Sequence, residues 1–270
     1  MLLKVKPKKL QIYTANGKLT CAQVRQKTGC DICINGTLYN MSNYETVCDV
    51  KIDGKIMSND EYTYVGYGWK NGDARATVAL SSEMNKWDNF ISCVMMIKDG
   101  ASQEMYYSYA LNGKRGRTAF GYDKDGNMII YVSKDGTSDA CNPKQLQDKM
   151  LSYGCVDAIM LDGGGSSQID CDEGKVTTSR KVANYICIWV EDNGKEKCPY
   201  TEPTTNVKMN TRGSGAKWVQ WFLNKVDNAG LAVDGIFGKL SVAALKKFQE
   251  ENGLVADGIC GKLTRAALKR

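Results

Sequence analysis

A polar stretch in the last third of the chain most constrains how this sequence can fold. Residues 191–216, EDNGKEKCPYTEPTTNVKMNTRGSGA, hold two of the four prolines and lack the apolar periodicity of a helix or strand. Single domains commonly run to about 100–200 residues, so 270 residues allow one large domain and one small one. We therefore expect a large domain at 1–195, a linker at 196–211 and a small module at 212–270.

The small module contains an internal repeat. LAVDGIFGKLSVAALKKF from Leu231 aligns with LVADGICGKLTRAALKR from Leu254 at an offset of 23 residues. In each copy a Gly-rich turn leads to a hydroxyl residue, Ser241 or Thr264, that suits a first helical turn, and apolar residues then recur on one helical face. With AKWVQWFLNKV ahead of them, the two copies predict an all-α module of three helices.

The doubled DG-x-x-G pattern of this module resembles the peptidoglycan-binding module of many cell-wall hydrolases, over residues 212–270. The resemblance implies that the module binds a bacterial wall glycan. From Lys217 to Arg270 nine basic and five acidic residues give a charge of +4, which would help to hold an anionic wall polymer.

The large domain alternates helix and strand patterns. Thr20 with Gln23 predicts a capping box for a helix that Gly29 ends, and Asn142-Pro143 opens a second helix. Apolar strand patterns occupy 31–35, 62–68, 91–97, 117–123, 128–132, 157–162 and 183–190. We expect an α+β fold with a mixed sheet and an all-α carboxyl-terminal module.

The chain has no histidine, and this limits its chemistry. Ser-His-Asp hydrolysis, Cys-His peptidase chemistry and His-ligated zinc all need an imidazole. Most of the eleven cysteines are expected to be reduced, because the count is odd and several lie in apolar strands. Cys30 and Cys33 have C-x-x-C spacing without the second pair that a zinc site usually needs, so we expect buried thiols, no metal and no cofactor.

The stretch LDGGGSSQ follows the apolar strand pattern DAIM. Leu161 ends that strand, so Asp162 should lie at its carboxyl end, and the three glycines at 163–165 cost more backbone entropy than chain reversal requires. Bare amides at this point can form a concave nest for an anion, with Ser166 and Ser167 as further donors. A tight structural turn is the alternative interpretation, and no nucleotide-binding fingerprint matches.

Four segments, CDICING, GRTAFG, LDGGGSS and SRKVANY, resemble the phosphodiester glycosidase family over about residues 20–190. The resemblance implies catalytic roles for Asp162, Arg117 and Asn35. It implies substrate binding by Gly36, Thr118, Gly163, Gly164, Gly165, Ser166, Ser167, Arg180 and Asn184. The family usually continues N-G-G-F-F where this chain has N-G-T-L-Y at 35–39, a departure that affects the sugar bound more than the reaction.

The chemistry that the resemblance implies is possible without histidine. In a sugar-1-phosphodiester the leaving phosphate is already a stable anion, so the usual acid of a two-carboxylate glycosidase becomes dispensable. Arg117 suits the phosphate through its planar charged fork, aided by the amides of the glycine turn. Asp162 suits the oxocarbenium-like sugar, either by stabilising the cation or by activating water.

Together these features predict a wall-targeted glycoside hydrolase of the phage endolysin type, which cleaves a sugar-1-phosphodiester or related linkage in wall polymers such as teichoic acids. MLLKVKPKKL has no signal-peptide core, so we expect synthesis in the cytoplasm and action on the wall after release. We expect a monomer with no nucleic-acid partner and no membrane insertion. One alternative is a peptidoglycan glycosidase that takes a second carboxylate from Glu45, Glu83 or Glu104; another is a non-catalytic wall-glycan-binding protein.

Overall fold

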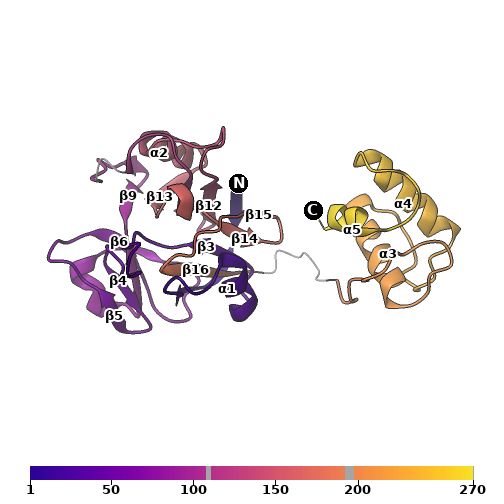
Figure 1. The fold of residues 1–270 in the computed structure, drawn as a ribbon, viewed down its shortest axis with the longest axis horizontal. Coiled ribbons are helices and arrows are strands. Elements are labelled where there is room, and N and C mark those ends of the chain that lie inside the picture. The colour runs from indigo at the N-terminus through magenta and orange to yellow at the C-terminus, as the bar shows by residue number, and fades with distance from the viewer. Residues whose placement is uncertain (108–110, 192–197, 270) are drawn as a thin grey trace. The chain divides into compact units, whose positions relative to one another are not determined.

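The computed structural model describes residues 1–107, 111–191 and 198–269. The chain forms two compact units, Met1–Asn193 and Gly194–Arg270 (Figure 1). Strands with two α-helices make up the first unit and three α-helices the second, which confirms the α+β class and the helical module. Within the described ranges no helix is both long and apolar enough to cross a membrane.

The described strands of the first unit form three sheets. Every strand pair in them is antiparallel, so the expected mixed sheet is wrong; parallel neighbours need a long crossover connection, and none of these pairs is joined in that way. In spatial order the first sheet contains β1 (Leu2–Val5), β12 (Met128–Ser133), β11 (Arg117–Asp123), β13 (Cys155–Met160), β9 (Val94–Lys98) and β10 (Ala101–Ser102). The second contains β15 (Gly174–Val176), β14 (Ile169–Cys171), β3 (Ile32–Asn35), β16 (Asn184–Val190) and β2 (Pro7–Thr14). The third contains β5 (Lys55–Ser58), β4 (Val50–Ile52), β8 (Asn89–Ser92), β6 (Val65–Trp69) and β7 (Thr77–Leu80).

One apolar core joins the three sheets, because alternate residues of each strand point inward. Helix α1 (Cys21–Thr28) packs on the other face of the second sheet, and α2 (Pro143–Ser152) packs beside β13 and β9 of the first. The shared core includes Ile34, Val50, Tyr67, Phe120, Ile159 and Ile186. The strands that carry the glycine-rich stretch and its neighbours therefore end at fixed positions.

The predicted helix boundaries are confirmed. Thr20 and Gln23 form a capping box, and Gly29 ends α1 in the left-handed conformation at φ 67°. Asn142 and Gln145 form a second capping box, with Pro143 between them as the first residue of α2. The expected strand at 91–97 is two strands, β8 and β9, which belong to different sheets.

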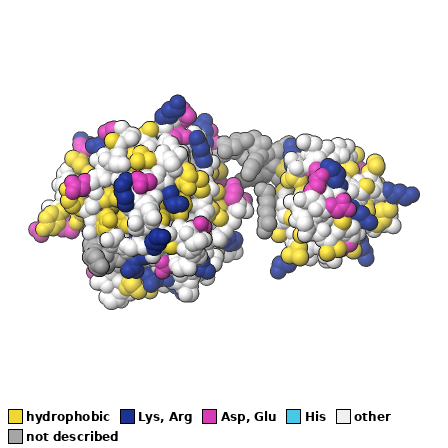
Figure 2. All heavy atoms as spheres, turned by 90° about the horizontal axis from the view of Figure 1, so that it is seen from above, with side chains coloured by type: hydrophobic (Ala, Val, Ile, Leu, Met, Phe, Trp, Pro, Cys, Tyr) yellow, Lys and Arg dark blue, Asp and Glu magenta, His cyan; other side chains and the backbone are white. Residues whose placement is uncertain are grey.

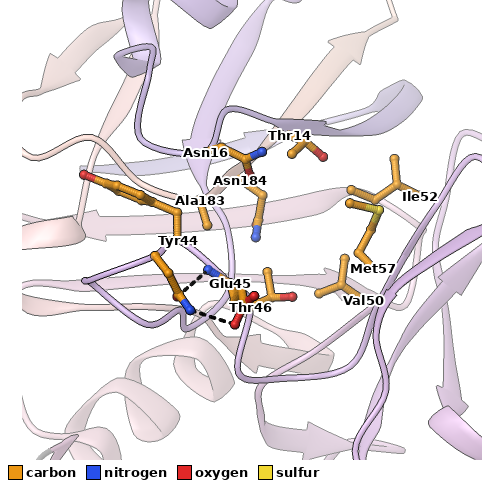
Figure 3. A pocket seen from close by; sticks show the side chains of 11 residues that line it. Thr14, Asn16, Tyr44, Glu45, Thr46, Val50, Ile52, Met57, Ala183 and Asn184 are labelled. Atoms are coloured by element: carbon orange, nitrogen blue, oxygen red, sulfur yellow. Dashed lines mark hydrogen bonds between the residues drawn. The ribbon is translucent and has the colours of Figure 1, made fainter.

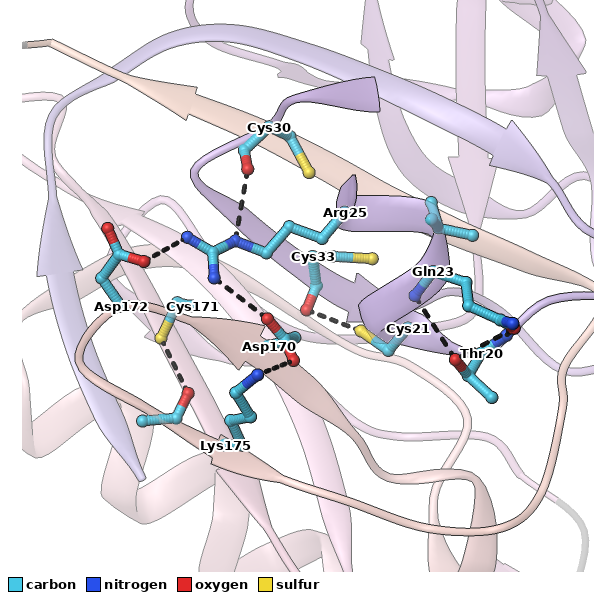
Figure 4. Close-up of polar contacts among 12 residues, drawn as sticks. Thr20, Cys21, Gln23, Arg25, Cys30, Cys33, Asp170, Cys171, Asp172 and Lys175 are labelled. Atoms are coloured by element: carbon cyan, nitrogen blue, oxygen red, sulfur yellow. Dashed lines mark hydrogen bonds and ion pairs between the residues drawn. The ribbon is translucent and has the colours of Figure 1, made fainter. Parts of the chain in front are cut away.

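An ion-pair network fastens α1 to the hairpin of β14 and β15 (Figure 4). The Arg25 guanidinium donates to the Asp170 carboxylate at 3.0 Å and also pairs with Asp172, while Lys175 lies 2.8 Å from the second Asp170 oxygen. On the same helix the Cys21 thiol donates to the Cys33 carbonyl at 3.0 Å. The network holds the segment that follows the glycine-rich stretch.

The cysteines are free thiols, as expected. Cys30 and Cys33 are both buried in the apolar cluster beneath α1. Their C-x-x-C spacing therefore places two small apolar side chains in the core.

The second unit consists of α3 (Ser214–Asp227), α4 (Lys239–Glu251) and α5 (Lys262–Leu268). Residues 198–211 differ from the expected linker, because Val207 is buried and forms a β-bridge with Cys260. The first two linker positions, 196 and 197, lie outside the described residues. Val207 therefore anchors part of the expected linker to the core of the second unit, which begins earlier in the chain than predicted.

A buried glutamine explains the repeated DG-x-x-G pattern. Gln220 accepts from the Gly235 amide at 2.9 Å and donates to the Asp234 carboxylate, the Ile236 carbonyl and the Ser241 hydroxyl. In the second copy Gln249 makes the same four bonds, to Gly258, Asp257, Ile259 and Thr264. Each DG-x-x-G turn is thus tied to the preceding helix, and its second residue adopts a positive φ that suits glycine.

We expect Gln220→Ala and Gln249→Ala each to destabilise the second unit by about 1–3 kcal/mol, because each leaves buried donors and acceptors without partners. Urea titration followed by hydrogen exchange of peptides from this unit would measure the effect. Glu250→Ala, on the exposed face of α4, is the control. An effect of either glutamine variant no larger than that of Glu250→Ala would mean that the networks do not stabilise the turns.

Candidate active site

Several strand ends of the first unit meet at one buried side chain, Asn35 at the end of β3. Its amide nitrogen donates to the Asp162 carbonyl at 2.8 Å. Its amide oxygen accepts from the Thr118 hydroxyl at 2.6 Å and from the Gln168 amide at 3.0 Å. Asn35 and Thr118 have no exposed surface. Both side chains therefore hold the strand ends together, and neither has exposed surface for a ligand to contact.

The Asp162 carboxylate lies at the centre of this arrangement. Its backbone amide donates to the Gly36 carbonyl at 3.1 Å, and its Oδ1 accepts from the Gly163 amide at 2.8 Å. Burial raises the pKa of Asp162, while the Ser166 hydroxyl, the Gly163 amide and the Arg180 charge oppose that rise. The site thus contains a half-buried carboxylate beside a guanidinium.

Each of the three glycines has its own structural reason. A Cβ on Gly163 would lie 2.8 Å from the Gly116 carbonyl oxygen. Gly164 has a φ of 59°, in the left-handed region. A Cβ on Gly165 would lie 3.0 Å from the Arg180 guanidinium carbon. The glycines therefore let the loop approach a neighbouring strand, reverse direction and lie flat against the arginine.

Three of the four amides expected to form an anion nest already have hydrogen-bond partners. The Gly163 amide donates to the Asp162 carboxylate, the Gly164 amide to the Gly116 carbonyl at 2.7 Å, and the Ser166 amide to the Gly163 carbonyl at 3.1 Å. Because these three donors are already paired, two within the loop and one with the residue before β11, they are not directed at an anion. The loop forms a 3-10 turn that presents Asp162.

Arg117 forms no hydrogen bond or ion pair with Asp162 in the described structure, although the sequence suggested that it would bind the phosphate beside it. Its side chain is almost fully buried and donates to the carbonyls of Cys141 at 2.9 Å, Leu111 at 2.8 Å and Gly113 at 2.8 Å. With these bonds made, the guanidinium holds two loops beneath the glycine turn. Burial also lowers the Arg117 pKa.

Arg180 is the cation that the structure brings to the carboxylate. Its guanidinium lies 3.4 Å from the Ser166 hydroxyl oxygen, and its charge opposes the rise that burial causes in the Asp162 pKa. Its backbone is fixed on both sides: the amide donates to the Thr178 hydroxyl at 3.2 Å, and the carbonyl accepts from the Gln168 side chain at 3.2 Å. Because Arg180 is only half buried, it can contact a ligand.

Tyr39 and Gln168 belong to the site, although the sequence gave neither a firm role. The Tyr39 hydroxyl donates to the Lys181 carbonyl at 3.2 Å, and its ring stacks on Tyr44 with centroids 5.7 Å apart. Burial raises the Tyr39 pKa, against the effect of the nearby Ser166 hydroxyl. The departure from the family pattern at 35–39, N-G-T-L-Y, is the sequence signal that could have indicated Tyr39. A glutamine after two serines is too common a pattern to indicate a role for Gln168.

Gly36 and Asn184 contact one another at the edge of the site. A Cβ on Gly36 would lie 1.7 Å from the Asn184 amide oxygen, which accepts from the Thr37 amide at 3.2 Å. The ends of β3 and β16 are therefore in direct contact beside the Asp162 backbone. Ser167 is buried, and its hydroxyl has no partner among the described residues.

The three glutamates considered as a second carboxylate lie on the surface. Glu45 accepts from the Asn43 side chain at 2.7 Å, and Glu83 forms an ion pair with Lys86. Glu104 is also exposed. In the part of the chain that the structure describes, none of the three has a hydrogen bond or ion pair with Asp162.

Comparison with known proteins agrees with this architecture. Residues 28–189 match the phosphodiester glycosidase family, and residues 212–268 match the peptidoglycan binding domain. The first match covers more than half of the chain, so the chain belongs to the phosphodiester glycosidase family. The resemblance found in the sequence motifs is thereby confirmed.

Two curated relatives are similar to parts of this chain. N-acetylglucosamine-1-phosphodiester alpha-N-acetylglucosaminidase of Mus musculus is 25% identical over 210 residues, which is 62% of this chain and 41% of the relative. The SPbeta prophage-derived uncharacterized protein YomE of Bacillus subtilis (strain 168) is 31% identical over 114 residues, 40% of this chain and 17% of the relative. The chain thus spans less than half the length of these relatives.

Solved structures show the same fold. The zebrafish N-acetylglucosamine-1-phosphodiester alpha-N-acetylglucosaminidase catalytic domain, auto-inhibited by its pro-peptide, matches with a TM-score of 0.53 and 18% identity, covering 68% of this chain and 73% of that one. A hypothetical protein from Synechocystis matches with a TM-score of 0.55 and 13% identity, covering 70% and 59%. At these identities the likeness concerns the fold alone.

Proposed function

We propose that the chain is a cell-wall-targeted glycosidase of the endolysin type that hydrolyses a sugar-1-phosphodiester linkage in a bacterial wall polymer. The observation that carries the proposal is that the Asp162 carboxylate and the half-buried Arg180 guanidinium both contact the Ser166 hydroxyl, the guanidinium at 3.4 Å. Such a pair supplies a negative group for a developing sugar cation and a positive group for a departing phosphate. Family membership supports the reaction class.

In this mechanism the bond between the anomeric carbon and the phosphate oxygen breaks, and the phosphate leaves with both bonding electrons. Arg180 neutralises the departing phosphomonoester, so no acid is needed. Asp162 stabilises the oxocarbenium-like sugar and accepts a proton from the water that adds to the anomeric carbon. Asn35 and Gln168 keep the two charged groups in place.

The second unit supports delivery to the wall, since residues 212–268 match a peptidoglycan binding domain. Figure 2 shows basic and acidic side chains spread over the visible face of this unit, without one basic patch. Leu240 and Leu263, at equivalent positions of the repeat, are 77% and 74% exposed. Apolar contacts therefore add to the positive charge of the unit as a means of binding the wall. The prophage relative agrees with an endolysin-like role.

Incubation of the purified protein with isolated Gram-positive walls tests the function. Mass spectrometry of the soluble products should show sugar reducing ends together with phosphomonoesters. New reducing ends on muropeptides without phosphate would instead identify a peptidoglycan glycosidase. Tight wall binding without release would identify a recognition protein and contradict the proposal.

The pH dependence of the reaction should report Asp162. The reaction needs the carboxylate, and burial raises the pKa of this group above its ordinary value of 3.8. We therefore expect kcat to be constant at neutral pH and to fall as the pH is lowered through the raised pKa. A kcat-pH profile measured at saturating substrate checks this. A profile that stays level down to pH 3.8 would show that the reaction does not use the Asp162 carboxylate.

A further inference from the structure

A cavity of about 260 Å³ opens where the second and third sheets meet (Figure 3). We call it the Asn184 cavity. Its lining residues come from the ends of β2 and β16, from β4 and β5, and from the loop at 43–46: Thr14, Asn16, Asn43, Tyr44, Glu45, Thr46, Val50, Ile52, Met57, Ala183 and Asn184. None of these residues takes part in the mechanism given above.

Asn184 presents an unused donor to this cavity. The side chain is only 2% exposed, and its amide nitrogen has no hydrogen-bond partner in the described structure. Its orientation is fixed, because the amide oxygen must face the Thr37 backbone amide, which donates to it at 3.2 Å. Figure 3 shows the nitrogen directed into the cavity. A buried donor without a partner is costly, so a ligand oxygen here would stabilise the site.

The lining chemistry selects an uncharged ligand. Val50, Ile52 and Met57 form an apolar wall, and hydroxyl and amide groups stand opposite. Lys and Arg are absent from the lining residues, whose single charged group is the carboxylate of Glu45. A phosphate would therefore be repelled, whereas a pyranose, with an apolar ring face and peripheral oxygens, matches both walls. The volume lies just below the roughly 300 Å³ at which pockets hold drug-sized ligands, which suits a single sugar ring.

The cavity is linked to the reacting carboxylate through Gly36. The Gly36 amide donates to the Asn184 carbonyl at 2.9 Å, and the Gly36 carbonyl accepts from the Asp162 amide at 3.1 Å. Tyr44, on the cavity side, stacks on Tyr39, which lies beside Ser166 and Asp162. A ligand that spans these groups would have its charged part at Arg180 and its uncharged part in the cavity.

We propose that the Asn184 cavity binds one uncharged sugar residue of the substrate, with the Asn184 amide nitrogen donating to a sugar oxygen. The proposal rests on the proposed function, because it assigns the two halves of a sugar-phosphodiester to opposite sides of Asp162. Sugar specificity then depends on residues 43–57, which the glycine-rich motif does not include.

Filling the cavity tests this proposal without altering the Asp162 site. Met57→Trp adds a ring at the cavity wall, and Ile56→Trp is the matched control, because it adds the same ring at the adjacent exposed position outside the lining. Asn184→Asp is a second variant, which keeps the acceptor for Thr37 but removes the donor. Binding of N-acetylglucosamine, glucose and inorganic phosphate to the full chain would be followed by NMR, and thermal unfolding would verify folding.

We expect the wild-type chain and Ile56→Trp to bind at least one of the sugars, and Met57→Trp and Asn184→Asp to bind it about tenfold more weakly or worse. Phosphate binding should be unaffected by Met57→Trp. Unchanged sugar binding in folded Met57→Trp, or no sugar binding by the wild type, would overturn the proposal.

Hydrolysis measured on the same preparations separates this inference from the proposed function. Sugar binding that Met57→Trp abolishes, without any hydrolysis by the wild type, would support the cavity and refute the glycosidase. Hydrolysis whose KM is the same in Met57→Trp and Ile56→Trp would support the glycosidase and refute the cavity.

Discussion

Replacing Asp162 with asparagine should lower kcat by about 10²–10⁴, the effect of removing one positioned acid or base group. The amide keeps an oxygen for the Gly163 amide at 2.8 Å, so the loop should retain its shape. It carries no negative charge for the sugar cation and cannot take a proton from water. Steady-state hydrolysis of a sugar-phosphodiester released from walls would measure the loss.

The stability of this variant separates a catalytic role from a structural one. Burial raises the pKa of Asp162 in the folded state above its value in the unfolded state. Between these two pKa values the folded state binds more protons than the unfolded state, so the protein loses stability as the pH rises from the lower value to the higher one. At neutral pH the ionised carboxylate is therefore a cost to folding, and Asp162→Asn should unfold at the same temperature as the wild type or higher. Asp125→Asn, in the exposed β11–β12 turn, is the control for the same chemical change. Unaltered kcat in Asp162→Asn would remove the carboxylate from the mechanism.

Local sequence signals predicted both helices of the first unit and most of its inner strands, but not the short inner strands β4 and β14. Capping boxes and glycine stops depend on residues within a few positions, and they are correct at both helices. The edge strands β1 and β2 gave no such signal, because the lysines at 4, 6, 8 and 9 hide the alternation. Charged side chains are common on edge strands, where they prevent association with other sheets.

The third sheet could not be deduced from pattern alone. β8 and β9 are separated by Cys93 and read as one apolar run, yet they pair in different sheets. β4 and β5 are three and four residues long, and β4 joins the sheet by pairing with β8, about 40 residues further on. Such long-range pairing is set by the tertiary fold.

In the candidate site, too, the sequence predicted what depends on neighbouring residues and not what depends on the tertiary fold. LDGGGSS placed Asp162 correctly at a strand end, because the buried strand and the glycines are adjacent in sequence. Which arginine faces Asp162 could not be predicted, since it depends on distant partners. Arg117 is occupied by carbonyls at 111, 113 and 141, whereas Arg180 is held by Thr178 and Gln168.

Replacing Arg180 with methionine should lower kcat/KM by about 10²–10³, the loss typical of one group that stabilises transition-state charge. The guanidinium is the cation beside Asp162 and the Ser166 hydroxyl, and it is accessible to a departing phosphate. Arg180→Lys should be intermediate, because it restores the charge but not the planar fork that binds two phosphate oxygens. Hydrolysis rates and inorganic phosphate binding, measured on the same variants, would both show this order.

Variants of two other arginines test whether the loss of activity is specific to Arg180. Arg115→Met removes an exposed cation from the loop ahead of β11 and should leave the rate unchanged. Arg117→Met leaves the Leu111, Gly113 and Cys141 carbonyls without their donor, so its main effect should be a lower unfolding temperature. If Arg117→Met abolished phosphate binding in a folded protein while Arg180→Met did not, Arg117 would be the phosphate ligand. The carbonyls of Leu111 and Gly113 would then have to release the Arg117 guanidinium when substrate binds.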